Sequence, residues 1–150
     1  MDKQTRTVLL TLGIPASGKT TYAKSLVEQG WKRINRDDLR WMLDSYKFSK
    51  KNEKFIVDLR NYIIRSLILD GYNIIIDDTN INPQNERDIR EIIKLMNNES
   101  LESGQKYQYN VEVKLFDIPL EVCIERNFKR ENPVPEKVIR IMYKKLKSMI

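Results

Sequence analysis

One short segment constrains this chain more than any other. Residues 13–20 read Gly-Ile-Pro-Ala-Ser-Gly-Lys-Thr, which matches the pattern G-x-x-x-x-G-K-[ST], and an apolar run at residues 8–12 precedes it. Glycines let the backbone N–H groups of such a turn converge on an anion, and a helix that begins there adds the positive end of its dipole. The sequence therefore predicts a buried strand, a phosphate-binding turn and a helix, in that order.

The residue types in this loop indicate which groups it binds. Lys19 is expected to reach the β- and γ-phosphates of a nucleoside triphosphate, and the Thr20 hydroxyl to ligate Mg²⁺. The residues expected to contact the nucleotide are the loop and the residue that follows it: Gly13, Ile14, Pro15, Ala16, Ser17, Gly18, Lys19, Thr20 and Thr21.

Strand-like and helix-like segments alternate along the rest of the chain. Strands are expected at residues 8–12, 31–35, 73–77 and 109–117, and polar loops at 47–53 and 98–108. Helices are expected at residues 20–29, from a cap at Asp37 or Asp38 to about 46, and at 54–70, 82–97, 119–127 and 136–149. This alternation predicts an α/β fold, a parallel sheet flanked by helices, in a single domain over residues 1–150.

The chain has 150 residues, no histidine and one cysteine, Cys123. Mechanisms that need an imidazole base or ligand are excluded, as are a disulfide framework and a thiolate zinc site. Proton chemistry near neutral pH must then depend mainly on carboxylates. Because the sequence shows neither a signal peptide nor an apolar run long enough to span a membrane, a cytoplasmic protein without membrane contact is expected.

Two pairs of carboxylates follow expected strands, where ligands bind in open α/β sheets. Asp37-Asp38 follows the second strand, and Asp77-Asp78 ends the third. One site could accept the proton of an attacking hydroxyl and the other could lie near Mg²⁺, with Asp77 or Asp78 acting through water. Arg40 lies one helical turn after Asp37 and suits a phosphate or carboxylate on the acceptor. Helix capping and a strand-end turn are the alternative interpretations.

Basic residues occur in two blocks, within a net charge of +6. Residues 32–65 hold ten basic and five acidic side chains, and residues 126–150 hold eight basic and two acidic ones. Arg126 and Arg130, four residues apart, fit a lid over the triphosphate, although a solvated basic helix end is the simpler alternative. Trp41, Tyr46 or Phe48 could stack on a terminal base or belong to the core.

Taken together, these segments resemble the kinase domain of phage-type polynucleotide 5′-kinases, the kinase half of the polynucleotide kinase/3′-phosphatase enzymes. The match covers nearly the whole chain. Its blocks are the phosphate loop at 13–20, Asn35-Arg36-Asp37-Asp38-x-Arg40, Asp78-Thr79-Asn80-x-Asn82-Pro83, Phe116-Asp117-x-Pro119, Arg126-Asn127-x-Lys129-Arg130, and Val134-Pro135 leading into Met142-Tyr143-Lys144.

The resemblance implies a P-loop kinase fold of the adenylate-kinase type, with ATP and Mg²⁺ as cofactors. The activity it implies is transfer of the ATP γ-phosphate to the 5′-hydroxyl end of DNA or RNA, in the repair of nucleic-acid ends. Asp37 would be the general base, and Arg40 would bind the acceptor's phosphate. The remaining matches would place Lys19 and Thr20 at the ATP phosphates and Mg²⁺, Arg126 and Arg130 in a lid, and Asp78 and Thr79 beside the acceptor.

Two alternatives share the same loop. A small-molecule kinase acting on a sugar, nucleoside or antibiotic would not need the basic blocks, and a non-catalytic nucleotide-binding switch would not need Asp37 and the arginines. The chain stops at Ile150 and has no Asp-x-Asp-Gly-Thr motif. Unless it is part of a longer protein, the chain is expected to lack the phosphatase activity of the family it resembles.

Overall fold

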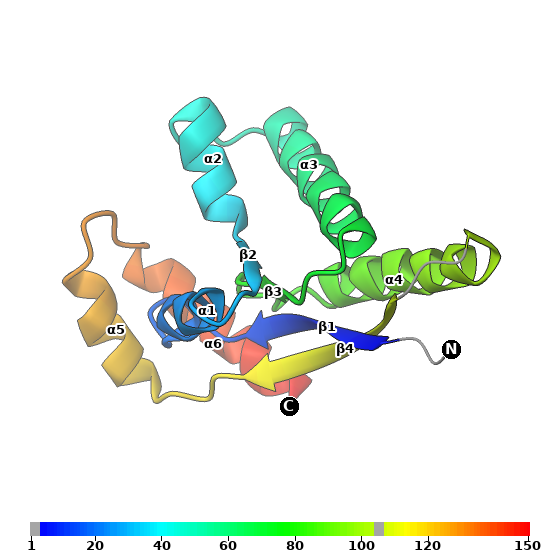
Figure 1. Cartoon of the computed structure of the whole chain (residues 1–150). Coiled ribbons are helices and arrows are strands. Elements are labelled where there is room, and N and C mark those ends of the chain that lie inside the picture. Colours follow the sequence, from blue (N-terminus) through cyan, green and yellow to red (C-terminus); the bar gives the residue numbers. More distant parts are fainter. Residues whose placement is uncertain (1–3, 104–106) are drawn as a thin grey trace.

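A computed structural model describes residues 4–103 and 107–150 as four strands and six helices (Figure 1). The strands are β1 (Gln4–Leu12), β2 (Lys32–Ile34), β3 (Ile74–Ile76) and β4 (Tyr107–Leu115). They pair in parallel in the order β2-β3-β1-β4. The helices are α1 (Lys19–Val27), α2 (Arg36–Asp44), α3 (Lys50–Leu69), α4 (Pro83–Ser103), α5 (Leu120–Phe128) and α6 (Glu136–Met149). The predicted α/β fold, with a parallel sheet flanked by helices, is confirmed.

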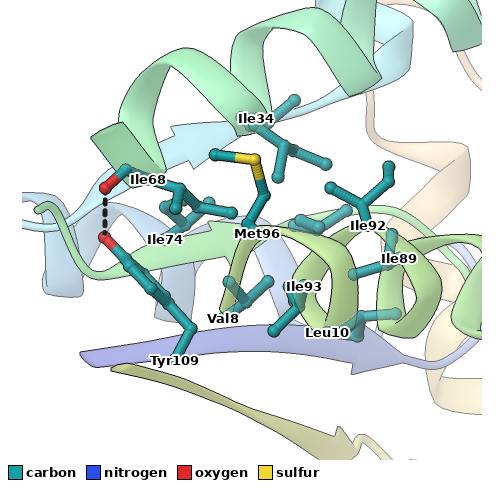
Figure 2. Packing of buried hydrophobic residues seen from close by; sticks show 12 residues of the cluster. Val8, Leu10, Ile34, Ile68, Ile74, Ile89, Ile92, Ile93, Met96 and Tyr109 are labelled. Carbon is teal, nitrogen blue, oxygen red and sulfur yellow. Dashed lines mark hydrogen bonds between the residues drawn. The ribbon is translucent and has the colours of Figure 1, made fainter. Parts of the chain in front are cut away.

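The sheet is covered on both faces because successive strand residues point to opposite sides. Val8, Leu10 and Ile74 face α3 and α4, where the main core forms (Figure 2). Tyr109 closes one end of this core, and its hydroxyl donates to the carbonyls of Tyr72 (2.7 Å) and Ile68 (3.5 Å). On the other face, Leu9 and Ile75 pack against α1.

A separate cluster lies beneath the phosphate-binding loop. It joins Ile14 and Ile81, which follow β1 and β3, to Cys123 of α5 and to Ile139 and Leu146 of α6. The last two helices thus support the loop rather than the centre of the sheet. In Figure 1, α2 projects away from the sheet after β2, and the first turns of α3 extend away from it as well. The last turns of α3 lie on the sheet, where Ile64 and Ile68 join the main core.

Three sequence-based predictions about helix ends are wrong. Asn35 caps α2 by accepting the Asp38 N–H, so Asp37 and Asp38 lie within the first turn. Helix α3 begins at Lys50 with Ser49 as its cap, so most of the predicted 47–53 loop is helical. Helix α4 continues to Ser103, into the predicted 98–108 loop, of which residues 104–106 lie outside the described residues. In both loops the polar residues are compatible with a helix, and polarity alone does not end one.

Replacing Ile75 by alanine is expected to cost about 2–5 kcal/mol of unfolding free energy, since it removes buried methyl groups and leaves a cavity. Ile75 is fully buried between β1 and β2 and packs against α1. Urea unfolding of both proteins measures the loss. Val113→Ala on the edge strand β4, where the side chain is 38% exposed, is the control and should cost much less. Equal losses would contradict this account of the core.

None of the helices in the described ranges is long and apolar enough to cross a membrane.

Candidate active site

The loop after β1 has the geometry that binds phosphate. Gly18 precedes α1 with a left-handed backbone (φ 99°), and Ala16 adopts φ 64°, so two positions turn the N–H groups inward. Gly13 is required for a different reason, namely space. A Cβ there would lie 2.8 Å from the Ser17 hydroxyl and 3.0 Å from the Phe116 Cβ. The Gly13 N–H also donates to the Thr79 carbonyl (3.1 Å), which holds the loop against the chain that follows β3.

Lys19 lies inside this loop with 7% of its surface exposed. Its ammonium donates to the Ile14 carbonyl at 2.6 Å and lies 3.4 Å from the Ser17 hydroxyl. Burial lowers the pKa of Lys19 from 10.5 to about 8, and the nearby charge of Asp77 only partly opposes this shift. A phosphate bound in the loop would favour the charged ammonium. Thr21, the residue after the loop, is exposed on α1.

This pKa gives the binding of ATP an expected dependence on pH. The positive charge of Lys19 is complete well below pH 8 and is lost as the pH rises through that value, so affinity should fall above about pH 8. Around pH 8.5, binding should be accompanied by proton uptake, because the phosphates raise the pKa. Calorimetry in buffers of different ionisation enthalpy measures this uptake. A Lys19→Met variant should show none, and equal uptake by the variant would contradict the assignment.

Asp77 lies at the carboxyl end of β3 and faces the start of α1. Its Oδ2 accepts hydrogen bonds from the Thr20 hydroxyl (2.9 Å) and from Arg33 Nε (2.7 Å). Its Oδ1 is buried and has no hydrogen-bond partner among residues 4–103 and 107–150. A hydroxyl beside a carboxylate oxygen without a partner fits Mg²⁺, which binds few protein ligands and keeps several waters. Thr20 and Asp77 are therefore the residues that could hold the ion with the nucleotide phosphates.

The neighbouring Asp78 anchors α2. Its carboxylate accepts the backbone N–H of Arg36 (3.0 Å) and the Arg36 Nε (3.2 Å), so it joins the first turn of α2 to the end of β3. Burial raises the pKa of Asp78, and the charge of Arg36 opposes this shift. The Asn35 side chain adds a second link by donating to the Asp77 carbonyl. The two carboxylates after β3 thus act in different directions, Asp77 toward the phosphate loop and Asp78 toward α2.

Asp37 and Arg40 lie one turn apart on α2, as predicted, and form an ion pair. Asp37 is 56% exposed, so its other oxygen can reach an incoming hydroxyl. Arg40 is more buried and is held by Glu53 of α3 through two hydrogen bonds, to Oε2 at 2.9 Å and to Oε1. These hydrogen bonds lower the pKa of Glu53. Arg40 is therefore a fixed guanidinium beside Asp37, with Glu53 behind it.

The predicted lid arginines lie at the end of α5 and beyond it. Arg126 is in the last turn of the helix, whereas Arg130 is two residues past its end, so the two do not share a helical face. Both are exposed, and neither guanidinium forms a hydrogen bond or ion pair with another described residue. The charge of Arg130 lowers the pKa of Lys19, which places it near the phosphate loop. Asn127 clamps the base of this segment by two hydrogen bonds to the Val134 backbone, at 2.7 and 3.0 Å.

Four residues of the site were missed by the sequence reasoning. Arg33 bridges Asp38 and Asp77, while Arg36 and Glu53 hold α2 in place. Arg60 is fully buried on α3, and its Nη1 has no hydrogen-bond partner among the residues that the structure describes. A signal for Arg60 exists in the sequence, since Ile56, Arg60, Ile64 and Ile68 recur every four residues and place the arginine on a buried stripe. Arg36 lies in the block at residues 35–40 that carries the family resemblance, whereas Arg33 and Glu53 have no comparable signal.

The described residues include no group of three or more acidic or cysteine side chains arranged to hold a metal ion without help from a ligand.

A left-handed turn, a buried lysine and a strand-end aspartate that contacts the threonine of the turn define a P-loop nucleotide-binding protein. A family model described as an AAA domain matches residues 8–149, nearly the whole chain, which therefore belongs to that family. Loop and family together imply that it binds ATP.

Relatives with assigned names extend this result. The chain is 31% identical to a candidate bifunctional polynucleotide kinase/RNA ligase of Autographa californica nuclear polyhedrosis virus, over 92% of this chain and 20% of the relative. It is 27% identical to L-seryl-tRNA(Sec) kinase of Methanococcus maripaludis, over 92% of this chain and 51% of that protein. It thus spans about a fifth of the first relative and about half of the second. A structure of the Pnkp1/Rnl/Hen1 RNA repair complex matches 97% of this chain and 45% of its own, with TM-score 0.80 and 24% identity.

Proposed function

We propose that this chain transfers the γ-phosphate of ATP to the 5′-hydroxyl end of a nucleic acid. The observation that supports this most strongly is the pair of carboxylates at the end of β3. Asp77 contacts Thr20 of the phosphate loop, and Asp78 fixes Arg36, the residue before Asp37. Two adjacent residues therefore connect the triphosphate site to the helix that carries the exposed carboxylate Asp37.

Each step of the phosphoryl transfer can be assigned to a particular side chain. Asp37 accepts the proton of the attacking hydroxyl, since the chain has no histidine. Arg40 binds the phosphate that follows the terminal nucleoside, and Lys19 stabilises the charge on the β- and γ-phosphate oxygens. Arg126 and Arg130 close over the transferring phosphoryl group. Thr20 and Asp77 would hold Mg²⁺ with the nucleotide, and the ion would supply positive charge to the phosphates.

The choice of a nucleic acid as acceptor has two supports. The viral relative is named as a polynucleotide kinase/RNA ligase, and the solved structure with the TM-score of 0.80 is an RNA repair complex. The other support is charge, because the segment that carries Asp37 and Arg40 lies in the block of ten basic and five acidic residues at 32–65. Phosphate contacts supply much of the affinity for nucleic acid.

The deciding experiment is incubation with γ-labelled ATP and 5′-hydroxyl oligonucleotides of DNA and RNA, single-stranded, blunt or recessed. Label at the 5′ end of at least one is expected, and its KM should rise steeply with salt. Label in none of them would overturn the proposal. Transfer to a sugar or nucleoside with little dependence on salt would instead favour a small-molecule kinase. Tight ATP binding without transfer to any acceptor would indicate a nucleotide-binding switch.

A further inference from the structure

Two aromatic side chains contact each other at α2: Trp41, which follows Arg40 in the helix, and Tyr46, two residues past its end. Trp41 is 46% exposed and Tyr46 is 42% exposed. Their ring centroids are 5.2 Å apart, with the planes inclined by 32°. Exposed large aromatics that touch each other offer a flat apolar surface to a ligand.

The backbone holds Tyr46 in an unusual place. Ser45 and Tyr46 both have left-handed conformations, with φ of 49° and 64°. For a bulky residue such a conformation is unfavourable by about 1–2 kcal/mol. The turn is closed by the Tyr46 N–H, which donates to the Arg40 carbonyl at 3.1 Å. This strained turn folds Tyr46 back along α2. Residues with such strained backbone conformations are concentrated at functional sites.

This turn brings Tyr46 to the candidate base. The Arg40 guanidinium lies 5.9 Å from the centre of the Tyr46 ring. Burial, followed by the negative charge of Asp37, raises the pKa of the Tyr46 phenol, so the phenol and the carboxylate are neighbours. Asp37, Arg40, Tyr46 and Trp41 thus form a continuous surface that leads from the catalytic carboxylate outward.

The surroundings of the pair are basic and apolar. Lys47, Lys50 and Lys51 are exposed, and their ammonium groups form no ion pair with the described residues. Phe48 between them is 71% exposed. Alternating cations and aromatic rings match a single-stranded nucleic acid, whose phosphates bind lysine and whose bases stack on rings. A purely apolar protein partner would offer no negative charge to these lysines.

We propose that Trp41 and Tyr46 form the binding site for the terminal nucleobase of an unpaired 5′ end. This inference rests on the proposed kinase function and specifies its substrate. The base stacks on Trp41 and Tyr46, the 5′-hydroxyl of the same nucleoside lies at Asp37, and the following phosphate lies at Arg40. The lysines at 47, 50 and 51 bind phosphates further along the strand. An acceptor without a terminal base would lose the stacking contact but keep the others.

The test pairs a change in the protein with a change in the acceptor. The kcat/KM of the wild-type protein is measured on a 5′-hydroxyl single strand and on the same strand with an abasic first residue. Loss of the base is expected to lower kcat/KM about tenfold, as for loss of one stacking contact. Trp41→Ala should show a similar loss on the intact strand and little further loss on the abasic one. Trp41→Phe should restore most of the activity.

Independent losses, in which Trp41→Ala lowers the rate on both strands by the same factor, would overturn the inference and leave the kinase function standing. Failure of the wild-type protein to label any oligonucleotide would overturn the function itself. Tyr62→Ala, an aromatic on α3 that is 70% exposed, is the matched control and should behave as wild type.

A binding measurement supplies a readout without catalysis. The chain has two tryptophans, so Trp31→Phe leaves Trp41 as the only fluorophore of its kind. A 5′-hydroxyl single strand should quench its fluorescence in the absence of ATP, and the abasic strand should quench it less. Equal responses to the two strands, or no response to either, would contradict stacking at Trp41.

Discussion

Asp37→Asn is expected to remove nearly all phosphorylation of a 5′-hydroxyl oligonucleotide while ATP still binds. The amide keeps the shape of the side chain but cannot accept the proton of the attacking hydroxyl, and the chain has no histidine to replace it. A general base contributes about 10²–10⁴ to the rate, so a loss of that size in kcat is expected. Because Asp37 is 56% exposed, the substitution should leave the fold intact.

Single-turnover rates with labelled ATP measure this loss, and nucleotide titration establishes that binding is retained. Asp44→Asn is the matched control, since it makes the same change at the other end of α2. It should phosphorylate the oligonucleotide at the wild-type rate. A wild-type rate in Asp37→Asn would remove Asp37 as the base, and a parallel loss of ATP binding would show that the residue has a structural role instead.

Asp77→Asn is expected to produce the second largest effect. The carboxylate accepts from Thr20 and Arg33 and leaves a buried oxygen without a partner beside the phosphate loop. Neutralising it removes a charge that attracts Mg²⁺, so the activity should fall about 10²–10³-fold at low Mg²⁺. The concentration of Mg²⁺ that gives half-maximal activity should rise, and added Mg²⁺ should recover part of the rate.

Asp117→Asn is the control for this experiment, because Asp117 also follows a strand but is half exposed and paired with Lys147. Its dependence on Mg²⁺ should equal that of the wild type. Thermal unfolding of Asp77→Asn is measured alongside, since Arg33 loses a charged partner. An unchanged Mg²⁺ dependence in Asp77→Asn would place the ion elsewhere.

The sequence predicted the elements of the fold well and the contacts between them less well. The apolar runs around Leu9 and Ile75 placed these two strands correctly, because a parallel strand buried on both faces reads as a continuous apolar run. The cap of α2 was assigned to Asp37 or Asp38, whereas Asn35 caps it. All three residue types are good caps, and only the path of the chain selects among them.

The candidate site likewise has a part that the sequence predicted and a part that it did not. Residues 13–20 could be identified as a phosphate loop from sequence alone, because a contiguous turn followed by a helix is governed by local backbone geometry. The link between Thr20 and Asp77 joins residues 57 positions apart, and the pair Arg36–Asp78 joins residues 42 positions apart. Such contacts depend on the order of strands in the sheet, which places β3 between β1 and β2.

The sequence by itself thus determined the fold class, the phosphate loop and the absence of an imidazole base. These features follow from residue types and from short-range periodicity. Only the tertiary structure decided that Asp77 faces the loop, that Asp78 holds α2, and that Glu53 fixes Arg40. It also decided that Trp41 and Tyr46 are exposed beside Asp37 rather than buried. The physical reason is that packing brings distant charges and rings together, and no local pattern in the chain encodes which of them meet.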